Sequence, residues 1–274
     1  MAMNFVAELG LRTVATLETF GDFCRFIGRT FYWIVTSGAS KRNIYMTLRQ
    51  MYEIGVRSVP VVMITGAFVG MVLAAQSVLQ FKAVGLEADL GSIVNLSVVR
   101  ELGPVLAAII LAGRVGGALA AELGTMRVTE QMDALRAMGA DPIRVLVVPR
   151  FLACVILMPF LVLYADLTGI LGGYVISVRV YDVNAAAFWE HAARSVEMFD
   201  IVTGLIKGTV FVAAMSLITC YHGFRCKPGA AGVGQACTES FVESCMSILA
   251  LDFFLGVFFN AFYALMWGSP PTAI

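Results

Sequence analysis

The sequence predicts an all-α integral membrane protein, with five transmembrane helices, an amphipathic helix before them and a short helix in one connection. Of the 274 residues, 59% are hydrophobic and only 14% are charged, whereas soluble domains are about 45–50% apolar and about 25% charged. The apolar residues also gather into five stretches long enough to cross a bilayer. The formal net charge is zero and no basic run is interleaved with aromatic residues, so nucleic acid is not an expected partner.

The five expected spans carry few charges. The first, from Ser58 to Gln80, has no charged residue in 23 positions, and as a helix it would be roughly 35 Å long, which is enough to cross a bilayer. Spans three, four and five each carry one charge, namely Asp166, Lys207 and Asp252. Lys207, like Glu122 at the end of the second span, is expected to extend toward the interface. The spans are 58–80, 93–121, 151–178, 201–224 and 244–269.

Lysine and arginine residues predict the orientation of the chain, because they collect in the cytoplasmic connections of membrane proteins. Seven precede the first span and four lie between spans two and three, whereas on the opposite side Lys82 is accompanied by Glu87 and Asp89. We therefore expect a cytoplasmic N-terminus and a C-terminus on the outer side. The two basic groups are Arg12, Arg25, Arg29, Lys41, Arg42, Arg49 and Arg57, and then Arg127, Arg136, Arg144 and Arg150.

Residues 4–36 have a different pattern from the spans. Apolar residues such as Cys24 and Ile27 recur at steps of three and four, and charged residues fill the other faces. This pattern predicts an amphipathic helix lying in the cytoplasmic interface, with a sixth span as the alternative. The chain then divides into an N-terminal interfacial helix region, 1–50, and a five-helix domain, 51–274.

Four spans carry glycines spaced four residues apart, which places both glycines on one helix face and lets another backbone approach closely. Ordinary packing within one bundle is one explanation of this pattern. Because five helices are few to enclose a sizeable substrate, a homodimer with a cavity at its seam is another. The pairs are Gly66 and Gly70, Gly113 and Gly117, Gly169 and Gly173, and Gly204 and Gly208.

Charges inside the second span need protein, water or a partner charge around them, because each costs roughly 2.5–3.5 kcal/mol near the bilayer centre. Arg100 and Arg114 are 14 residues apart, so on an α-helix their directions differ by about 40°. We expect the two arginines to form a basic stripe that points into the bundle. Glu101, Asp166 and Asp252 would neutralise its charge. These groups are either buried ion pairs that fix the helix register or part of a substrate site.

The connection 122–150 predicts a short amphipathic helix on the cytoplasmic side. Val128 and Met132 belong to its apolar face, and charged residues occupy the other faces. Gly139 is placed as a C-terminal stop, with Pro142 shortly after it. Such a helix is a candidate docking element for another protein, although a helix lying on the membrane would have the same pattern.

Several stretches of the sequence resemble the MlaE/YrbE-type permeases, which are membrane subunits of lipid-transporting ATP-binding-cassette systems. They are GAFVGMVLAAQ (66–76), RELGPVLAAIILAGRVGGALAAELG (100–124), MRVTEQMDALRAMGADPIRVLVVPR (126–150) and LALDFFLGVFF (249–259). The stretch DALRAMG (133–139) is also similar to the EAA-xxx-G loop of cassette permeases, with Asp133 in place of glutamate. The similarity runs from about residue 9 to 267 and is most specific at 97–151.

The resemblance implies a homodimeric permease whose coupling helix, about Thr125 to Met138 in this sequence, sits in a groove of a separate ATPase subunit. That subunit would hold ATP and Mg²⁺, since this chain has no GxxxxGK[ST] motif. The chain itself would be a non-catalytic subunit with no cofactor and no metal. Candidate contacts with the ATPase are Arg127, Glu130, Asp133, Ala134, Arg136 and Gly139.

The resemblance also implies a lipid cavity between the two protomers, lined mainly by spans one, two and five. The expected partners are a second copy of the chain, the ATPase, an MCE-domain protein that carries lipid beyond the membrane, and membrane phospholipid. The expected location is the cell inner membrane. Candidate cavity residues are Phe68, Met71, Leu79, Arg100, Glu101, Arg114, Asp252 and Phe253.

Residues 220–245 depart from the family pattern, because they contain four cysteines and His222. A metal site is not expected there, since no Cys-x-x-Cys pair is present. Two other functions stay open: an ion-coupled secondary transporter that uses the intramembrane acids as proton or cation sites, and a non-transporting membrane scaffold. An enzyme is not expected, because His191 and His222 are predicted to lie on opposite sides of the membrane.

Overall fold

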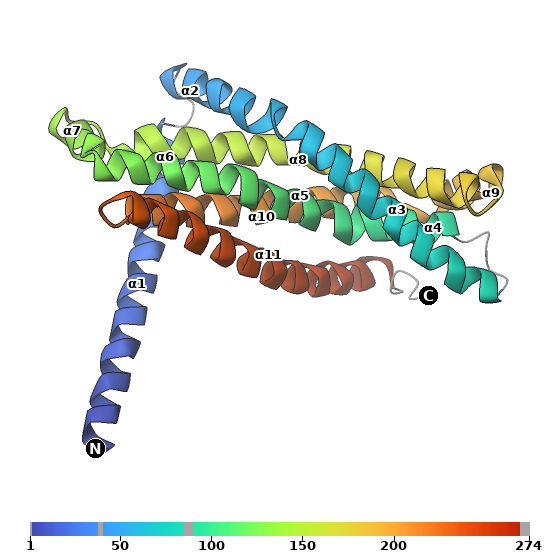
Figure 1. Ribbon diagram of the computed structural model, residues 1–274, viewed down its shortest axis with the longest axis horizontal. Coiled ribbons are helices and arrows are strands. Elements are labelled where there is room, and N and C mark those ends of the chain that lie inside the picture. The colour runs from blue at the N-terminus through green and yellow to red at the C-terminus, as the bar shows by residue number, and fades with distance from the viewer. Residues whose placement is uncertain (1, 38–40, 85–89, 269–274) are drawn as a thin grey trace.

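The computed structural model describes residues 2–37, 41–84 and 90–268, and every regular element in these ranges is a helix (Figure 1). Glu87, Asp89 and the C-terminal tail from residue 269, which entered the prediction of orientation, lie outside the described residues. The α-helices are α1 (Ala2–Ser37), α2 (Lys41–Met51), α3 (Val59–Val84), α4 (Leu90–Ser97), α5 (Gly103–Leu111), α6 (Gly117–Val128), α7 (Gln131–Ala137), α8 (Val148–Arg179), α9 (Ala185–Ser195), α10 (Met198–Phe224) and α11 (Ala230–Trp267). Short π-helical turns join some of them, namely η1 (Tyr52–Val56), η3 (Val98–Leu102), η4 (Ala112–Gly116) and η5 (Ile143–Val147).

Five helical runs in the described part of the chain are long and apolar enough to cross a membrane, which confirms the predicted all-α, five-span class. The helices continue beyond the apolar stretches, so the runs are longer than predicted. The first begins at Asn43, and the predicted boundary at residue 50 therefore falls inside it. The runs are Asn43–Lys82, Leu90–Val128, Ile143–Arg179, Met198–Phe224 and Ala230–Met266.

The backbones of α3 and α8 touch along the glycines of both helices. A Cβ atom added at Gly70 would lie 1.9 Å from the carbonyl oxygen of Gly169, and one added at Gly66 would lie 2.8 Å from that of Ala165. No side chain fits into such a contact, so glycine is what allows the two spans to approach this closely. This contact fixes the first span against the third.

The remaining glycines of the predicted pairs do not all behave alike. Gly173 meets a side chain of α4, and Gly204 meets a backbone carbonyl of η3, at 2.7 and 2.4 Å from the position of an added Cβ. Gly113 meets only the ring of Phe241 at 3.4 Å, and no described atom lies within 4 Å of the position of a Cβ at Gly117. In the described part of the chain, the Cβ positions of Gly113 and Gly117 therefore face no second backbone.

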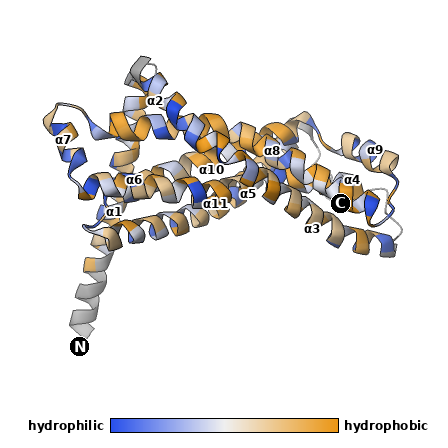
Figure 2. Cartoon of the chain, turned by 45° about the horizontal axis from the view of Figure 1, so that its top comes forward, coloured by the Kyte–Doolittle hydropathy of each residue, from blue (hydrophilic) through white to orange (hydrophobic). Residues whose placement is uncertain are grey.

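α8 and α10 form the centre of the bundle, whereas α11 lies on its outside. In the most apolar part of the runs containing α8 and α10, 56% of the residues are buried, but in α11 the share is 6%. Fully buried side chains such as Leu111, Met158 and Phe211 pack between α5, α8 and α10. Apolar residues nevertheless continue along α11 and α3 (Figure 2). These two helices consequently present apolar surface that the described part of this chain leaves uncovered.

α1 extends away from the bundle and meets it at the end that carries α7, while α9 lies at the opposite end (Figure 1). Phe26 of α1 packs edge-on against the rings of Tyr221 and Phe224, with centroids 5.8 and 5.6 Å apart. α1 is not among the five candidate spans. That it lies in the membrane interface stays a prediction.

Candidate functional site

A buried lysine inside the membrane-spanning bundle holds two carboxylates. The side chain of Lys207, nine residues into α10, is 1% exposed, and its Nζ donates to Glu101 Oε2 at 2.6 Å and to Asp252 Oδ1 at 3.0 Å. η3, α10 and α11 thus meet at one cation. The expectation that Lys207 extends to the interface is wrong, because carboxylates from two neighbouring spans pair with it inside the bundle.

Arg100 has a different acidic partner from those predicted. Its Nε donates to Asp200 Oδ1 at 2.5 Å, and the Asp200 side chain is 2% exposed. The second oxygen of Asp200 accepts from the backbone N–H of Glu197 at 2.9 Å, as part of the capping box that begins α10. A carboxylate at a helix N-terminus is itself stabilised there. Arg100 therefore binds to the start of α10, and its charge is not neutralised by Glu101.

Arg114 lies in separate surroundings from Arg100. Its Nη1 donates to Ser58 Oγ at 2.5 Å, and that hydroxyl donates in turn to the carbonyl of Ile54. Neither arginine pairs with the predicted acids Glu101, Asp166 and Asp252, and both lie in π-helical turns, Arg100 in η3 and Arg114 in η4. A π-helical turn contains more residues than an α-helical turn, so the 100° step per residue does not hold between the two arginines.

Asp166 also lies apart from the predicted stripe. The residue is 7% exposed, and its Oδ1 has no hydrogen-bond partner among the described residues. That oxygen abuts Gly103, where an added Cβ would lie 1.7 Å from it. With Asn95, Asp166 lines a mainly apolar groove of about 750 Å³. Asp166 therefore does not neutralise Arg100 or Arg114, contrary to the prediction.

The Lys207 network reaches an open surface through its acids. The Glu101 side chain is 49% exposed and that of Asp252 is 24% exposed. α5, which follows Glu101, contacts both α3 and α11 and runs between them in Figure 1. Both helices carry exposed apolar side chains at predicted cavity positions; Phe68, Leu79 and Phe253 are exposed, and Met71 is partly exposed.

The predicted coupling helix over 125–138 is divided into two parts. α6 ends at Val128, and the chain reverses at Glu130, which has a positive φ of 59°. The separate helix α7 follows and ends before Gly139, whose φ of 75° favours glycine. The helix ends just before Gly139, as the sequence predicts. The interruption of the helix at Glu130 was not predicted, because no proline or glycine lies there.

α7 presents a charged surface at one end of the bundle and is anchored by one buried side chain. Asp133 accepts from Arg127 at 3.0 Å and from Arg136 at 2.8 Å, with all three side chains substantially exposed. Ala134 is exposed beside them, while Met132 is 1% exposed and packs in the core below. The ion pairs place two arginines and one aspartate together on the exposed surface at this end.

Asp141 connects α1 to the segment that follows α7. Its Oδ2 accepts from Arg29 at 2.8 Å and from the Trp33 indole at 3.0 Å, and its Oδ1 accepts from the backbone N–H of Ile143 at 2.9 Å. Although burial raises the pKa of Asp141, hydrogen bonds from Ile143, Arg29 and Trp33 and the charge of Arg29 hold that pKa below its ordinary value. The ionised carboxylate thus fastens α1 to the bundle.

His222, in the cysteine-containing region, contacts two acids of α11. Its Nε2 lies 2.9 Å from Glu243 Oε2, and its Nδ1 lies 3.7 Å from Glu239 Oε2. Among the described residues, no group of three or more His, Cys, Asp or Glu side chains is arranged so that it could hold a metal ion. The contacts of His222 join α10 to α11 at the end of the bundle that carries α7.

Known proteins are similar to this chain over most of its length. The family model described as Permease MlaE matches residues 47–258. A probable ABC transporter permease protein of Rickettsia conorii is 41% identical over 257 residues, covering 93% of this chain and 97% of its own. The intermembrane phospholipid transport system permease protein MlaE of Haemophilus influenzae is 36% identical over 260 residues, covering 93% of this chain and 97% of its own.

A plant protein extends the comparison. The chloroplastic protein TRIGALACTOSYLDIACYLGLYCEROL 1 of Arabidopsis thaliana is 41% identical over 213 residues, which are 78% of this chain and 61% of the plant protein. The region matched by the family model contains η3, α7, Lys207 and Asp252. Together with the five-span, all-helical bundle, these matches show that the chain belongs to the MlaE permease family.

Proposed function

We propose that this chain is the membrane-embedded permease subunit of an ATP-binding-cassette lipid transporter that moves phospholipid. The single observation that carries the proposal is the Lys207–Glu101–Asp252 network, which opens from the bundle beside uncovered apolar helices. A lipid needs both kinds of surface, since its headgroup is polar and its chains are apolar. The Haemophilus relative, named for intermembrane phospholipid transport, supports the choice of phospholipid as substrate.

The exposure of Glu101 supports a homodimer. Contact between a half-exposed carboxylate and acyl chains is unfavourable, because a charge near the bilayer centre costs roughly 2.5–3.5 kcal/mol of free energy. A second copy packed along α11 and α3 would cover this surface and enclose a cavity between the protomers. Glu101 and Asp252 would then face polar headgroups or water in the cavity, and Phe68 and Phe253 would contact acyl chains.

ATP hydrolysis would act on this cavity from the α7 end. The proposed ATPase partner, which binds ATP and Mg²⁺, contacts α7 through the exposed charges of Arg127, Asp133 and Arg136. Because the helical run Leu90–Val128 continues from α6 back to η3, a displacement at the α7 end is carried along one span to Glu101. The cell inner membrane, a cytoplasmic α7 end and an MCE-domain partner at the other end complete the proposal.

Reconstituted transport tests the role of the network. In a complex of permease, ATPase and MCE-domain protein, Glu101→Gln removes the exposed charge but keeps a hydrogen-bonding side chain beside Lys207. We expect ATP-dependent phospholipid transfer between vesicles to fall about tenfold, which corresponds to the loss of one charge-assisted contact. Glu53→Gln is the matched control, because Glu53 is also about half exposed and ion-paired and has no assigned contact with the cavity or with a partner.

The outcomes distinguish the proposal from its two alternatives. Lower thermal stability with undiminished transfer would assign the network to helix register alone. Transfer driven by an ion gradient without nucleotide would indicate a secondary transporter. A complex that assembles but moves no lipid under either condition would indicate a scaffold.

A further inference from the structure

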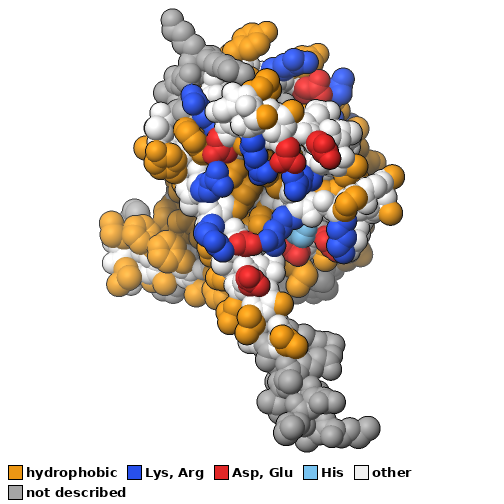
Figure 3. All heavy atoms as spheres, turned by 90° about the vertical axis from the view of Figure 1, so that its left-hand side faces the viewer, with side chains coloured by type: hydrophobic (Ala, Val, Ile, Leu, Met, Phe, Trp, Pro, Cys, Tyr) orange, Lys and Arg blue, Asp and Glu red, His pale blue; other side chains and the backbone are white. Residues whose placement is uncertain are grey.

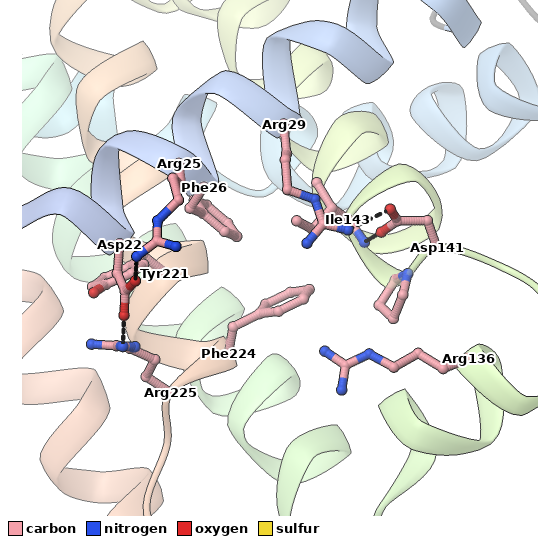
Figure 4. Close-up of a pocket in the computed structure, with 11 residues that line it drawn as sticks. Asp22, Arg25, Phe26, Arg29, Arg136, Asp141, Ile143, Tyr221, Phe224 and Arg225 are labelled. Carbon is pink, nitrogen blue, oxygen red and sulfur yellow. Dashed lines mark hydrogen bonds and ion pairs between the residues drawn. The ribbon is translucent and has the colours of Figure 1, made fainter. Parts of the chain in front are cut away.

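A pocket of about 560 Å³ lies between α1 and the bundle, at the end that carries α7. Its walls come from α1, from the end of α7 and the segment that follows it, and from the C-terminal end of α10. Figure 4 shows the side chains that line it. The pocket is remote from the Lys207 network in the middle of the bundle, and of its lining residues the transport proposal gives a role only to Arg136, as a contact with the ATPase.

The pocket has an excess of two positive charges, because four arginines and two aspartates line it. Asp22 pairs with Arg25 and Arg225 on one side, and Asp141 pairs with Arg29 on the other. These pairs place the guanidinium groups around the opening, and each guanidinium has more donors than one carboxylate can accept.

Arg136 adds a fourth guanidinium from α7. Its Nη1 donates to Asp133, and the side chain extends toward the centre of the pocket in Figure 4. Arginine side chains arranged in this way suit a phosphate group, which accepts hydrogen bonds from several guanidinium groups at once.

Aromatic side chains form the rest of the pocket lining. Phe26 packs edge to face against Tyr221 and against Phe224, and Phe224 lies between the two Asp–Arg pairs in Figure 4. A free inorganic anion would gain nothing from an aromatic wall. A phosphate ester with an apolar part matches both the arginines and the rings.

The apolar surface of α1 continues from this pocket. The segment just before Asp22 has four exposed apolar side chains, between 62% and 72% exposed, namely Leu11, Val14, Leu17 and Phe20. Figure 3 looks at this end of the molecule and shows charged side chains gathered on the bundle, with apolar ones on the part of α1 that extends from it. A helix with such a surface, next to a group of basic residues, is typical of the membrane–water interface.

We propose that this pocket binds the phosphate headgroup of an anionic membrane phospholipid, with its acyl chains along the apolar side of α1. This lipid is a bound partner of the permease and not the transported substrate. Because its headgroup would contact α1 and Arg136 together, it would tie the interfacial helix to α7. The proposal does not depend on the transport proposal, since binding is measured without ATP.

Photo-crosslinking of the full-length permease in nanodiscs tests the site. The discs contain phosphatidylcholine with a minor fraction of phosphatidylglycerol that carries a diazirine near its headgroup, and the labelled peptides are identified by mass spectrometry. We expect labelling on peptides from residues 22–29 and 221–225. Arg25→Gln is expected to lower it about fivefold, the effect of one interfacial arginine, and Arg25→Lys, which keeps the charge, to retain most of it.

The matched control is Arg57→Gln, since Arg57 is also an exposed arginine with a single ion pair on its own helix. An equal loss in this variant would overturn the proposal in favour of general attraction to a basic surface. Equal labelling by a phosphatidylcholine probe would overturn it as well. Competition by millimolar inorganic phosphate would identify a soluble phosphate as the ligand, and loss of labelling when the ATPase binds would identify a protein contact; either result contradicts a lipid site.

Discussion

Lys207 shows how one buried cation can determine the stability of three membrane helices. Its ammonium group is 1% exposed and contacts Glu101 and Asp252. Breaking a buried ion pair by removing one partner costs far more than replacing the whole pair with neutral groups, because the remaining charge is left without compensation. In this network a single substitution at the cation leaves two carboxylates unpaired.

We predict that Lys207→Met destabilises the protein by about 3 kcal/mol, at the low end for a broken buried pair, because Glu101 is partly exposed. Adding Glu101→Gln and Asp252→Asn to Lys207→Met removes the uncompensated charges and should recover most of the loss. Thermal melting of the three proteins in one detergent measures both effects. A triple variant no more stable than Lys207→Met would show that packing, and not charge, sets the cost.

Single residues also show what the sequence could predict about the site. The sequence indicated Glu101 and Asp252 as functional charges, since each is costly inside a span. It offered the same signal for Lys207, the only charged residue of 201–224, and pairing the lone charges of different spans would have linked it to Asp252. Asp200 was not predictable as the partner of Arg100, because it precedes the span and its position depends on how α10 begins.

At the scale of elements, five spans were predictable because length and hydropathy define them, but the directions of side chains within the second span were not. η3 and η4 interrupt this span at Arg100 and Arg114, and nothing in a helical repeat announces such turns. They are common at functional sites, and here one of them carries Glu101. The break at Glu130 was equally invisible, because a glutamate rarely adopts a positive φ.

The contact of α3 with α8 gives a prediction about glycine. Gly70→Ala should destabilise the protein by about 1–3 kcal/mol, the usual cost of overpacking, because the new Cβ would lie 1.9 Å from the carbonyl oxygen of Gly169. Gly117→Ala is the matched control, since nothing described lies within 4 Å, and it should change stability by less than about 0.5 kcal/mol. Melting in detergent compares them, and equal effects would contradict the packing described here.

The attachment of α1 should depend on acid in a defined direction. The pKa of Asp141 is lowered in the folded protein, so its contribution is fully present above the ordinary aspartate pKa of about 3.9. The contribution is lost as the pH falls through the lowered value. Distances between spin labels at Glu18 and Lys227 should therefore stay constant from pH 8 to pH 5 and lengthen only in stronger acid. Asp141→Asn should remove this transition, and lengthening already at pH 6 would exclude Asp141 as its cause.

For the whole molecule, the distribution of burial was less predictable than the number of spans. More than half of the most apolar part of α8 and of α10 is buried, whereas few residues in that part of α11 are fully buried, although all three have similar apolar sequences. Hydropathy does not distinguish a helix that faces lipid from one that faces a second copy of the chain. Glu101 and Asp252 are partly exposed beside α11, and a carboxylate is costly among acyl chains; this exposure is our reason to propose a second copy there.

A homodimer along α11 is therefore expected to bring two copies of Phe253 close together. In a background without the native exposed and partly exposed cysteines, Phe253→Cys should form a crosslinked dimer with a short bismaleimide in native membranes. Phe160→Cys is the matched control, because Phe160 of α8 is also an exposed phenylalanine within a span but lies on a helix outside the proposed seam. If the seam encloses the transport cavity, trapping the ATPase with ATP and vanadate should change the yield at residue 253 alone. Equal yields at the two positions would indicate random collisions, and a dimer crosslinked only at residue 160 would place the seam on α8.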